Sequence, residues 1–564
     1  MTDNLVEANN ESIEIESISH ASNNNTMGKQ WTSLLETLKK YDPKKDTLHF
    51  VSSKGEIESK VTRKEIDEKS TALATHLVVH HKMSKGDLCL LVFPPSLEFV
   101  LAFIACLKVG IIAVPAYPPH PGKSKDVLMF AQIVNDCGAT VALTSESYNF
   151  SKKMAGIQQS FSVKGKTDLA SSWPKCIKWI VVDSILNKGK NMKQNEEINL
   201  PFEFGATDVA FLQYTSGSTS NPKGVMITHL NLAHNLKIII NELQAREDTI
   251  VVSWLPQYHD MGLIGSLLGI VYCGGTGYYM SPLSFLQRPM LWLECVSRFQ
   301  GTHLQAPNFA FKLISRKFDA TRYSNQDLSL SSVRHIINAA EPIDAQSLEI
   351  FAKTFAPFGL RREVIFPTYG LAEHTVFVCS GGQQVLSVNK EDLERRDKVI
   401  IVEGKNTENI NIVRSIVGCG YPAKQNVDVR IVNSDTLEEL DEDLVGEIWI
   451  NSPSKALGYY KMSDLTSHDF HAKIDGVDEH TYLRSGDLGF IHNGELFICG
   501  RLKDMIIVAG RNYFPQDLEA TCESVSSLIR PGCIGAFSVS DDDAEEQVVL
   551  ISELREIIEA KVRL

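Results

Sequence analysis

The chain has 564 residues, of which 43% are hydrophobic and 22% charged, a composition typical of a globular protein with roughly two to four domains. Its formal net charge of −13 argues against nucleic-acid binding, because nucleic-acid-binding domains normally carry a basic excess. The 11 cysteines are widely spaced and include no Cys-x-x-Cys pair, which argues against a disulfide framework or a zinc ribbon. We expect a protein of a reducing, cytoplasmic compartment.

Residues 1–27 are predicted to form a disordered acidic tail. They carry several acidic side chains and many asparagines and serines, but residues 1–26 contain no arginine or lysine. This stretch lacks the basic start and the apolar run of a signal peptide. The most apolar run further on, residues 99–107, is too short to span a bilayer, so we expect no membrane insertion.

From about residue 30 to 380, strand-like apolar runs alternate with amphipathic, helix-like stretches. Thr228 can cap a helix in which Leu232, Leu236 and Ile239 have helical spacing. This alternation favours parallel sheets covered by helices, so we predict an α/β core over residues 28–415. The predicted strands cover residues 88–93, 177–182, 209–214, 250–254, 335–339 and 364–366.

Near residue 420 the pattern becomes rich in strands. Residues 427–432 and 447–451 are predicted strands, and residues 490–499 are a predicted hairpin. Its turn falls on Asn493-Gly494, a pair that suits a type I′ turn. We assign residues 416–502 to a β-rich subdomain of the N-terminal region and residues 503–564 to a small, mobile α+β C-terminal domain.

A loop rich in hydroxyls and glycine follows the strand predicted at 209–214. It reads Thr-Ser-Gly-Ser-Thr-Ser-Asn-Pro-Lys-Gly over residues 215–224. Hydroxyl donors, close approach of backbone amides and one cation, Lys223, are what a polyphosphate requires. The pattern is not a P-loop, and a mobile surface turn would have the same composition.

His259-Asp260 is a polar pair within the apolar stretch 254–265. The pair can line the mouth of an apolar pocket. The alternative is a helix N-terminus, in which Asp260 lies near the positive end of the helix dipole.

Two segments directly follow predicted strands: residues 338–342, Asn-Ala-Ala-Glu-Pro, and residues 367–373, Pro-Thr-Tyr-Gly-Leu-Ala-Glu. In doubly wound sheets, ligands bind beyond the carboxyl ends of the strands. The small alanines leave room for a flat base, Tyr369 can stack on it, and Glu373 can ligate Mg²⁺. Taken singly, each segment is equally well an ordinary turn between a strand and a helix.

Two further motifs are Ser-Gly-Asp-Leu-Gly at residues 485–489 and Gly-Arg-Leu-Lys-Asp at residues 500–504. One carboxylate accepts two hydrogen bonds from a cis-diol, so Asp487 suits a ribose, and Arg501 can hold ribose or phosphate. The alternative is a hairpin turn with a surface ion pair. A Gly-x-Ser-x-Gly elbow, which would indicate a serine hydrolase, is absent.

In this order and spacing, the motifs resemble the core signatures of the adenylate-forming superfamily, which includes acyl-CoA synthetases, luciferases and nonribosomal adenylation domains. The resemblance extends from about residue 30 to the end of the chain. Within the superfamily the chain is most similar to the fatty acyl-AMP ligases, on residues 116–119, 254–263 and 511–517. The stretch from Glu373 to Gly418 is longer than in the CoA-using relatives, which implies a family-type insertion at about residues 381–411.

The resemblance implies that ATP activates a fatty acid: the carboxylate attacks the α-phosphorus, giving acyl-AMP and pyrophosphate. Lys223, Glu373 and His259 are the expected catalytic residues, and Glu373 and Thr215 the expected Mg²⁺ ligands. The residues expected to bind ATP are Thr215, Ser216, Gly217, Ser218, Thr219, Lys223, Asn338, Ala339, Ala340, Glu341, Thr368, Tyr369, Gly370, Leu371, Asp487 and Arg501.

The resemblance also implies an acyl pocket and a second half-reaction. The pocket is expected at Met261, Gly262, Leu263 and Ile264, and core packing is the alternative reading of these residues. The acyl group would then pass to the phosphopantetheine thiol of an acyl carrier protein. Between the two steps the C-terminal domain would rotate about a hinge at Lys503 or Asp504. We expect the segment 381–411 to limit that rotation and so to exclude CoA as acceptor.

The sequence departs from the superfamily pattern at its C-terminal end. The resemblance implies a catalytic lysine near the end of a longer C-terminal domain, but no Pro-x-x-Gly-Lys segment is present and Lys561 is a poor candidate. We therefore expect an incomplete C-terminal domain, slow adenylation and retained ATP binding. Two alternatives stay open: an acyl-CoA or aryl-CoA ligase of the same superfamily, and a non-catalytic nucleotide- or lipid-binding homologue.

Overall fold

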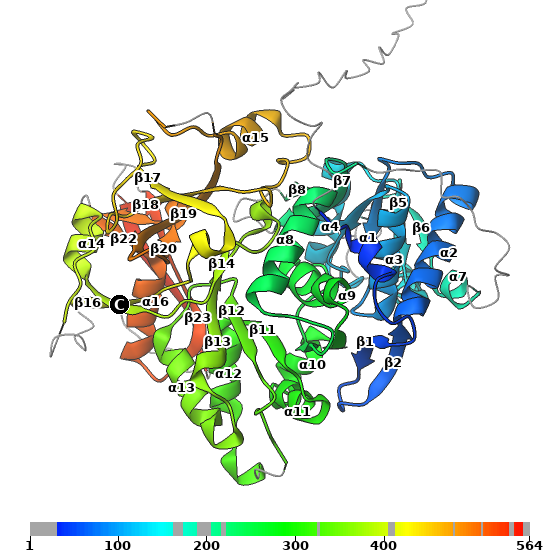
Figure 1. Ribbon diagram of the computed structural model, residues 1–564, viewed down its shortest axis with the longest axis horizontal. Coiled ribbons are helices and arrows are strands. Elements are labelled where there is room, and N and C mark those ends of the chain that lie inside the picture. The colour runs from blue at the N-terminus through cyan, green and yellow to red at the C-terminus, as the bar shows by residue number, and fades with distance from the viewer. Residues whose placement is uncertain are drawn as a thin grey trace, which may run out of the picture.

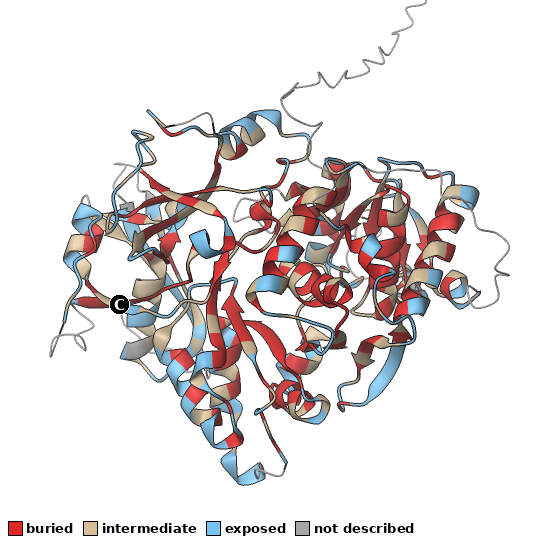
Figure 2. Cartoon of the chain, in the orientation of Figure 1, coloured by how far each residue is buried: buried red, intermediate tan, exposed pale blue. Residues whose placement is uncertain are grey.

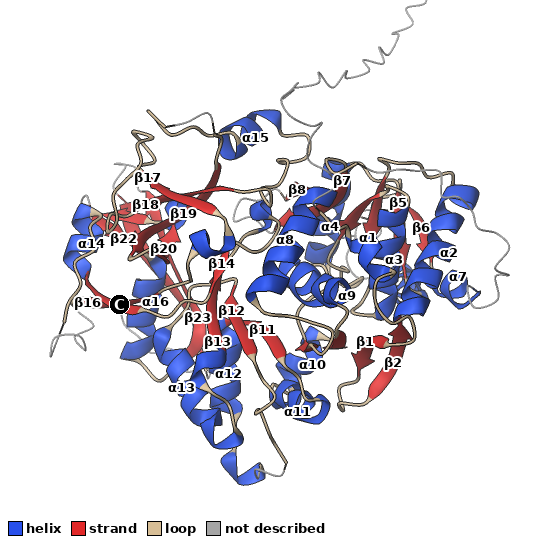
Figure 3. Cartoon of the chain, in the orientation of Figure 1, coloured by secondary structure: helices blue, strands red, loops and turns tan. Residues whose placement is uncertain are grey.

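The computed structural model describes residues 31–161, 173–188, 205–215, 222–323, 327–403, 412–477, 480–508, 511–540 and 546–555 (Figure 1). The tail expected at residues 1–27 and part of the expected insertion at 381–411 lie outside these ranges. The described chain has the predicted α/β architecture, with helices covering two mainly parallel sheets and further β-rich sheets beside them (Figure 3).

The larger sheet has eight strands. They are β1 (Asp46–Val51), β2 (Ile57–Thr62), β9 (Ile250–Ser253), β10 (Thr276–Met280), β11 (His303–Pro307), β12 (His335–Ala339), β13 (Ile365–Tyr369) and β14 (Cys379–Ser380). Their order is β14-β13-β12-β11-β9-β10-β1-β2, and all neighbours are parallel except the two edge pairs, β13–β14 and β1–β2. The carboxyl ends of β12 and β13 therefore lie side by side, which brings the predicted segments 338–342 and 367–373 together.

The second sheet has six strands. They are β3 (Leu88–Leu91), β4 (Ile112–Pro115), β5 (Val141–Thr144), β6 (Lys178–Val181), β7 (Val209–Thr215) and β8 (Lys223–Thr228), in the order β6-β5-β3-β4-β7-β8. Only β7 and β8 are antiparallel. The strands predicted in both sheets are confirmed, although the last one begins at Ile365 because residues Arg362–Val364 form a short 3-10 turn.

A layer of helices lies between the two sheets. It contains α1 (Leu34–Leu38), α2 (Arg63–His81), α3 (Leu97–Lys108), α8 (His229–Glu242), the π-helix η2 (Met261–Leu268) and α9 (Gly269–Cys273). The middle helix, α3, contacts β3 and β4 of one sheet and β1 and β2 of the other. Its apolar run is buried on every side, as expected for a helix that is hydrophobic all round (Figure 2). As predicted, Thr228 caps α8 by accepting from the backbone of Asn231.

Further helices cover the outer faces of the sheets. The six-stranded sheet packs on α4 (Ser124–Cys137) and α5 (Glu146–Phe161), while α7 (Asp183–Lys188) contacts α2. The eight-stranded sheet packs on α10 (Pro282–Gln287), α11 (Met290–Phe299), α12 (Asn308–Lys317) and α13 (Ala345–Phe355). None of the described helices is both long and apolar enough to cross a membrane.

The β-rich part contains a four-stranded antiparallel sheet of β17 (Asp428–Val432), β18 (Gly446–Asn451), β19 (Leu483–His492) and β20 (Glu495–Arg501). The predicted hairpin is longer than expected, but its turn lies at Asn493-Gly494, and both residues have positive φ as a type I′ turn requires. A second hairpin, β15 (Val385–Asn389) with β16 (Val413–Val417), carries α14 (Lys390–Arg396), and α15 (Ser463–Phe470) precedes β19.

The described part of the chain ends in a small lobe, residues 505–555, which we call the C-terminal lobe. It follows the 3-10 turn η9 (Leu502–Asp504). Its elements are β21 (Ile506–Val508), β22 (Arg511–Tyr513), α16 (Pro515–Val525), β23 (Ile529–Ser540) and β24 (Glu546–Leu554). The helix α16 packs on β23, so the lobe has the expected α+β character. The domain boundaries proposed above stay predictions.

Candidate active site

The two ends of the predicted phosphate loop are neighbours. Thr215 ends β7 and Lys223 begins β8, and the two residues pair across this antiparallel hairpin. Four loop residues expected to bind ATP, Ser216, Gly217, Ser218 and Thr219, lie outside the described residues. The hairpin therefore places Thr215 and Lys223 side by side at the two ends of the predicted phosphate loop.

Tyr459, which the sequence analysis missed, joins Lys223 to Glu373. Its segment pairs with β8, with a backbone bridge from Tyr459 to Val225. The Tyr459 hydroxyl donates to Glu373 Oε1 at 2.9 Å, and Lys223 Nζ lies 4.8 Å from the centroid of the same ring. One aromatic side chain thus contacts the lysine of the phosphate loop on its face and the candidate metal ligand at its tip. Local periodicity around residue 459 carries no signal for this contact.

The carboxylate of Glu373 lies in surroundings that disfavour its charged form. Glu373 lies in the 3-10 turn η6 (Ala372–His374), and its backbone carbonyl accepts from Ala456 N at 2.9 Å. Burial raises the pKa of Glu373, the charges of Asp487 and Asp260 raise it further, and the hydrogen bond from Tyr459 opposes them. A cation beside Glu373 would relieve this accumulation of negative charge.

The donors at this point fit Mg²⁺ held jointly with phosphate. Mg²⁺ in nucleotide sites is held by one or two carboxylates together with phosphate oxygens and water. Glu373 supplies one carboxylate, and no group of three His, Cys, Asp or Glu that could hold a metal occurs in the part of the chain that the structure describes. A cation at Glu373 would therefore depend on a bound phosphate for its remaining ligands.

Asp487 is held from two sides. The Tyr369 hydroxyl, at the end of β13, donates to Asp487 Oδ2 at 2.6 Å, and Arg501 Nε lies 3.5 Å from Asp487 Oδ1. Asp487 and Arg501 pair across the β19–β20 hairpin, so one register places both. Burial raises the pKa of Asp487, while Tyr369 and the charges of Arg501 and Lys503 lower it and Asp504 raises it. The residues of the expected hinge therefore lie within electrostatic reach of the site.

At the end of β12, Asn338 is fully buried and its Nδ2 donates to Asn308 Oδ1 at 3.0 Å. Its Oδ1 atom has no hydrogen-bond partner among the described residues. A buried acceptor without a donor costs free energy, and the exocyclic amine of adenine is a donor of the required kind. Ala340 follows with a φ of 71°, an uncommon conformation for alanine, and Glu341 accepts from the backbone N–H of Phe309.

In the segment after β13, the backbone at Gly370 lies very close to the backbone at Val376. A Cβ atom on Gly370 would lie 1.9 Å from the carbonyl oxygen of Val376, so a residue with a side chain does not fit there. Thr368 Oγ1 is hydrogen-bonded to Ser380 Oγ at 2.7 Å, and Leu371 precedes η6. Gly370 thereby lets the chain fold back and brings Tyr369 and Glu373 to the same edge of the sheet.

The structure places His259-Asp260 at the N-terminus of a helix, which is the alternative interpretation of this pair in the sequence. Asp260 Oδ1 accepts from Met261 N at 2.6 Å at the start of η2, and it lies 2.7 Å from His259 Nδ1. The negative charge of Asp260 is the main reason why the pKa of His259 is raised. Because the charge of Asp260 also acts on Glu373, the pair belongs to the same electrostatic environment.

The residues expected to line the acyl pocket, Met261, Gly262, Leu263 and Ile264, are buried within the hydrophobic core. A Cβ on Gly262 would lie 2.1 Å from the Pro256 carbonyl oxygen, so glycine lets η2 begin close to the preceding loop. Core packing accounts for their burial, and the acyl pocket stays a prediction.

The family model for AMP-binding enzymes matches residues 39–460. A medium-chain-fatty-acid–[acyl-carrier-protein] ligase, JamA, from Moorena producens is 38% identical over 526 residues, covering 92% of this chain and 84% of JamA. A long-chain-fatty-acid–AMP ligase, FadD32, from Mycobacterium marinum is 31% identical over 521 residues, covering 89% and 78% of the two chains.

Among solved structures, a fatty acyl-adenylate ligase from L. pneumophila in complex with acyl adenylate and pyrophosphate superposes with a TM-score of 0.74. It is 34% identical, and the match covers 93% of this chain and 87% of that one. The mixed α/β fold agrees with these matches. The chain therefore belongs to the AMP-binding enzyme family.

Proposed function

We propose that the protein uses ATP to activate a fatty acid as acyl-AMP, with release of pyrophosphate, and passes the acyl group to the phosphopantetheine thiol of an acyl carrier protein. One observation carries the proposal: the Lys223–Tyr459–Glu373 contacts and the Tyr369–Asp487–Arg501 contacts bring loops distant in sequence to one edge of the fold. The names of the relatives, ligases that act on fatty acids, support the same reaction.

In the first step, a carboxylate oxygen of the fatty acid bonds to the α-phosphorus of ATP while the bond from that phosphorus to the pyrophosphate oxygen breaks. The protein supplies mainly alignment and charge compensation. Thr215 and Lys223 face the phosphates, and Asp487 accepts from the ribose hydroxyls beside Arg501. Asn338 accepts from the adenine amine, with Ala339, Ala340 and Glu341 next to the base. When bound at Glu373, Mg²⁺ would neutralise charge on the phosphates.

In the second step, the carrier thiol attacks the acyl carbon, a thioester forms, AMP leaves and the thiol proton is released. The proposal assigns the choice of acceptor to the segment 381–411. The side chain of Glu394 on α14 accepts from Arg511 Nε at 2.6 Å, and Asp397 accepts from Asn512 Nδ2 at 3.2 Å. Both partners follow the expected hinge at Lys503 or Asp504, so these contacts oppose rotation of the C-terminal lobe.

The test measures pyrophosphate release and acyl-AMP formation with ATP, Mg²⁺ and straight-chain fatty acids of increasing length. We expect release to require a fatty acid and to rise with its length, since each buried CH₂ contributes about 0.8 kcal/mol. The variants Lys223→Ala and Asp487→Asn should abolish most of the pyrophosphate release. ATP binding without acyl-AMP from any fatty acid would instead support a non-catalytic nucleotide-binding homologue. Acyl-CoA formed as readily as the carrier thioester would support an acyl-CoA ligase.

A further inference from the structure

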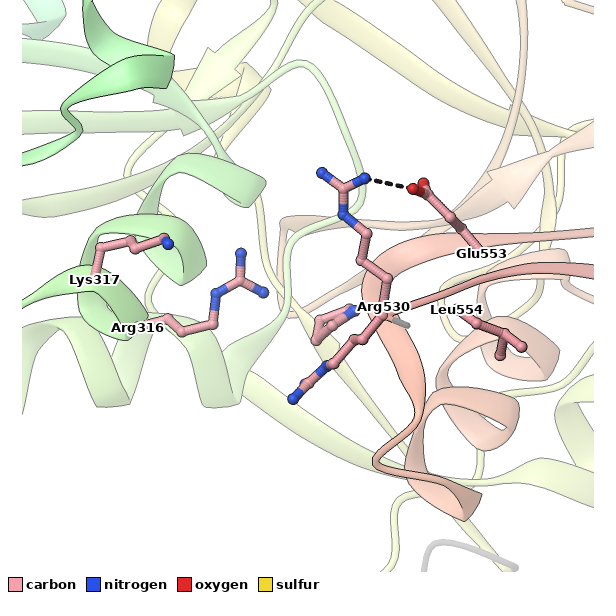
Figure 4. A pocket seen from close by; sticks show the side chains of 7 residues that line it. Arg316, Lys317, Arg530, Glu553 and Leu554 are labelled. Carbon is pink, nitrogen blue, oxygen red and sulfur yellow. Dashed lines mark hydrogen bonds and ion pairs between the residues drawn. The ribbon is translucent and has the colours of Figure 1, made fainter. Parts of the chain in front are cut away.

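A cavity of about 370 Å³ lies between the α/β core and the C-terminal lobe, and its lining contains none of the candidate active-site residues (Figure 4). Figure 4 shows Arg316 and Lys317, at the end of α12, on one side and Arg530 and Glu553, on the β23–β24 hairpin, on the other. We call this cavity the basic cleft. It is lined by Arg316, Lys317, Arg530, Pro531, Glu553, Leu554 and Arg555.

The cleft concentrates positive charge on a protein whose formal net charge is −13. Its lining holds three arginines, one lysine and a single carboxylate, Glu553, which pairs with Arg530 at 2.6 Å. The side chains of Arg316, Lys317 and Arg555 form no ion pair or hydrogen bond with another described residue. These three cations are exposed, so they are available to a partner of opposite charge.

We propose that the basic cleft is the docking surface for the acceptor of the proposed second step, a carrier protein that presents a carboxylate-rich face. This inference rests on the proposed function. An acidic partner is repelled by the overall charge of this chain, and a local positive surface both attracts it and selects its orientation. The cleft is built from the core and from the C-terminal lobe together, so a partner seated there contacts both and binds the arrangement of the lobe that the structure shows, before any rotation about the expected hinge.

The position of the cleft relative to the site supports a carrier with a flexible arm. The helix α12 begins at Asn308, whose side chain accepts a hydrogen bond from Asn338 at the candidate adenine site. Arg316 lies eight residues further along, which corresponds to about 12 Å at the rise of an α-helix. A carrier docked on the cleft would therefore lie about the length of α12 from the site. A prosthetic arm bearing the thiol can bridge that separation.

The experiment compares R316E/K317E with wild type in two separate measurements. The first is the Kd for the apo carrier protein, which cannot accept an acyl group, by fluorescence anisotropy at low and high salt. The second is acyl-AMP formation without any carrier. We expect the carrier Kd to rise roughly tenfold at low salt, with a weaker salt dependence, and acyl-AMP formation to stay unchanged.

The matched control is K39E/K40E, which reverses another pair of exposed, adjacent basic residues, the two lysines that follow the short helix α1. Because this pair is outside the cleft, its variant should bind the carrier as wild type does. Arg555→Glu tests the lobe side of the cleft separately, and we expect it to weaken binding as well. A carrier variant with its acidic face changed to lysines should bind the R316E/K317E enzyme more tightly than it binds the wild-type enzyme.

The outcomes separate the two claims. If acyl-AMP forms but R316E/K317E binds the carrier as tightly as wild type, the docking surface is overturned and the proposed adenylation stands. If the carrier binds with the expected charge dependence but no fatty acid is adenylated, the docking surface stands and the proposed first step fails. Equal weakening by K39E/K40E would show that only overall charge matters, and it would also overturn the cleft.

Discussion

At the residue scale, Tyr459 connects two groups that local sequence places in unrelated motifs. Its hydroxyl donates a hydrogen bond to Glu373, and its ring contacts Lys223. A half-buried carboxylate with a raised pKa depends on each hydrogen bond it accepts, since the bond stabilises the charged form. We infer that Tyr459 positions Glu373 and Lys223 relative to one another.

Replacing Tyr459 with Phe removes the hydroxyl and keeps the ring. We expect pyrophosphate release to fall about tenfold, because a hydrogen bond to a charged group contributes about 1.5–3 kcal/mol. The Mg²⁺ concentration that gives half-maximal rate should rise, while the KM for the fatty acid should not change. Tyr460→Phe, at the next position and without the Glu373 contact, should leave both quantities unchanged. A Tyr459→Phe enzyme with wild-type rate and Mg²⁺ dependence would contradict this role.

The His259–Asp260 pair predicts a pH dependence of stability. The pKa of His259 is raised above its ordinary value of 6.5, so the folded state binds more protons than the unfolded state between the two pKa values. The stabilisation is therefore complete below about pH 6.5 and is lost as the pH rises through the folded pKa.

The variant Asp260→Asn removes the charge and keeps a residue that can cap η2. We expect the difference in melting temperature between wild type and this variant to be largest in mildly acidic solution and to shrink at alkaline pH. Thermal melting across the pH range measures it, and an NMR titration of His259 should show a lower pKa in the variant. A difference in melting temperature that does not depend on pH would argue against the ion pair.

At the scale of an element, the segment that follows His259-Asp260 is a π-helix from Met261 to Leu268, continued as α-helix from Gly269. The departure from α-helical geometry lies where Gly262 approaches the Pro256 carbonyl and Gly265 approaches the Gln305 side chain. Such close approaches leave no room for Cβ atoms on that face. Single π-helical turns are frequent at functional sites, and this one lies directly after the His259–Asp260 pair.

Gly262→Ala tests this packing. The added Cβ would lie 2.1 Å from the Pro256 carbonyl oxygen, so we expect a loss of about 1–3 kcal/mol in the free energy of unfolding. Gly269→Ala is the matched control in the same helical stretch, because its Cβ would lie 3.5 Å from the Ile264 carbonyl, an ordinary contact. Denaturant unfolding of both variants measures the difference, and equal stabilities would show that the start of η2 can shift at little cost.

At the scale of the whole molecule, the contacts between α14 and β22 tie the β15–β16 hairpin to the C-terminal lobe. Glu394 is buried and accepts a hydrogen bond from Arg511, and Asp397 accepts one from Asn512. Among the described residues, Arg414 on β16 also pairs with Asp517 on α16 at 3.2 Å. A lobe that rotates about Lys503 or Asp504 would have to break them. Whether the lobe is held or released therefore depends on a few charged groups.

Deleting residues 381–411 should allow CoA to compete with the carrier as acyl acceptor, and Glu394→Gln should do so to a smaller extent. Acyl-CoA formation from a fatty acid and ATP measures both. Arg396→Ala is the control, since Arg396 pairs with Asp392 inside α14 rather than with the lobe. Continued rejection of CoA after the deletion would remove this explanation of acceptor choice.

Local patterns along the sequence determined much of this protein. The core strands, the cap at Thr228 and the Asn493-Gly494 turn follow from apolar spacing and from the chemistry of single residues, which act over a few positions of chain. The motifs around Lys223, Glu373 and Asp487 were also identified in sequence, because their residue types suit phosphate, Mg²⁺ and ribose.

Tertiary structure alone decided which of these groups touch. Tyr459 meets Glu373, Glu394 meets Arg511, and the basic cleft joins Arg316 to Arg530 across more than two hundred residues of chain. Periodicity reports whether a side chain faces inward, but not which distant segment it meets there. That partner is set by the packing of whole layers, and so the proposed coupling of site, lobe and carrier surface became visible only in the folded molecule.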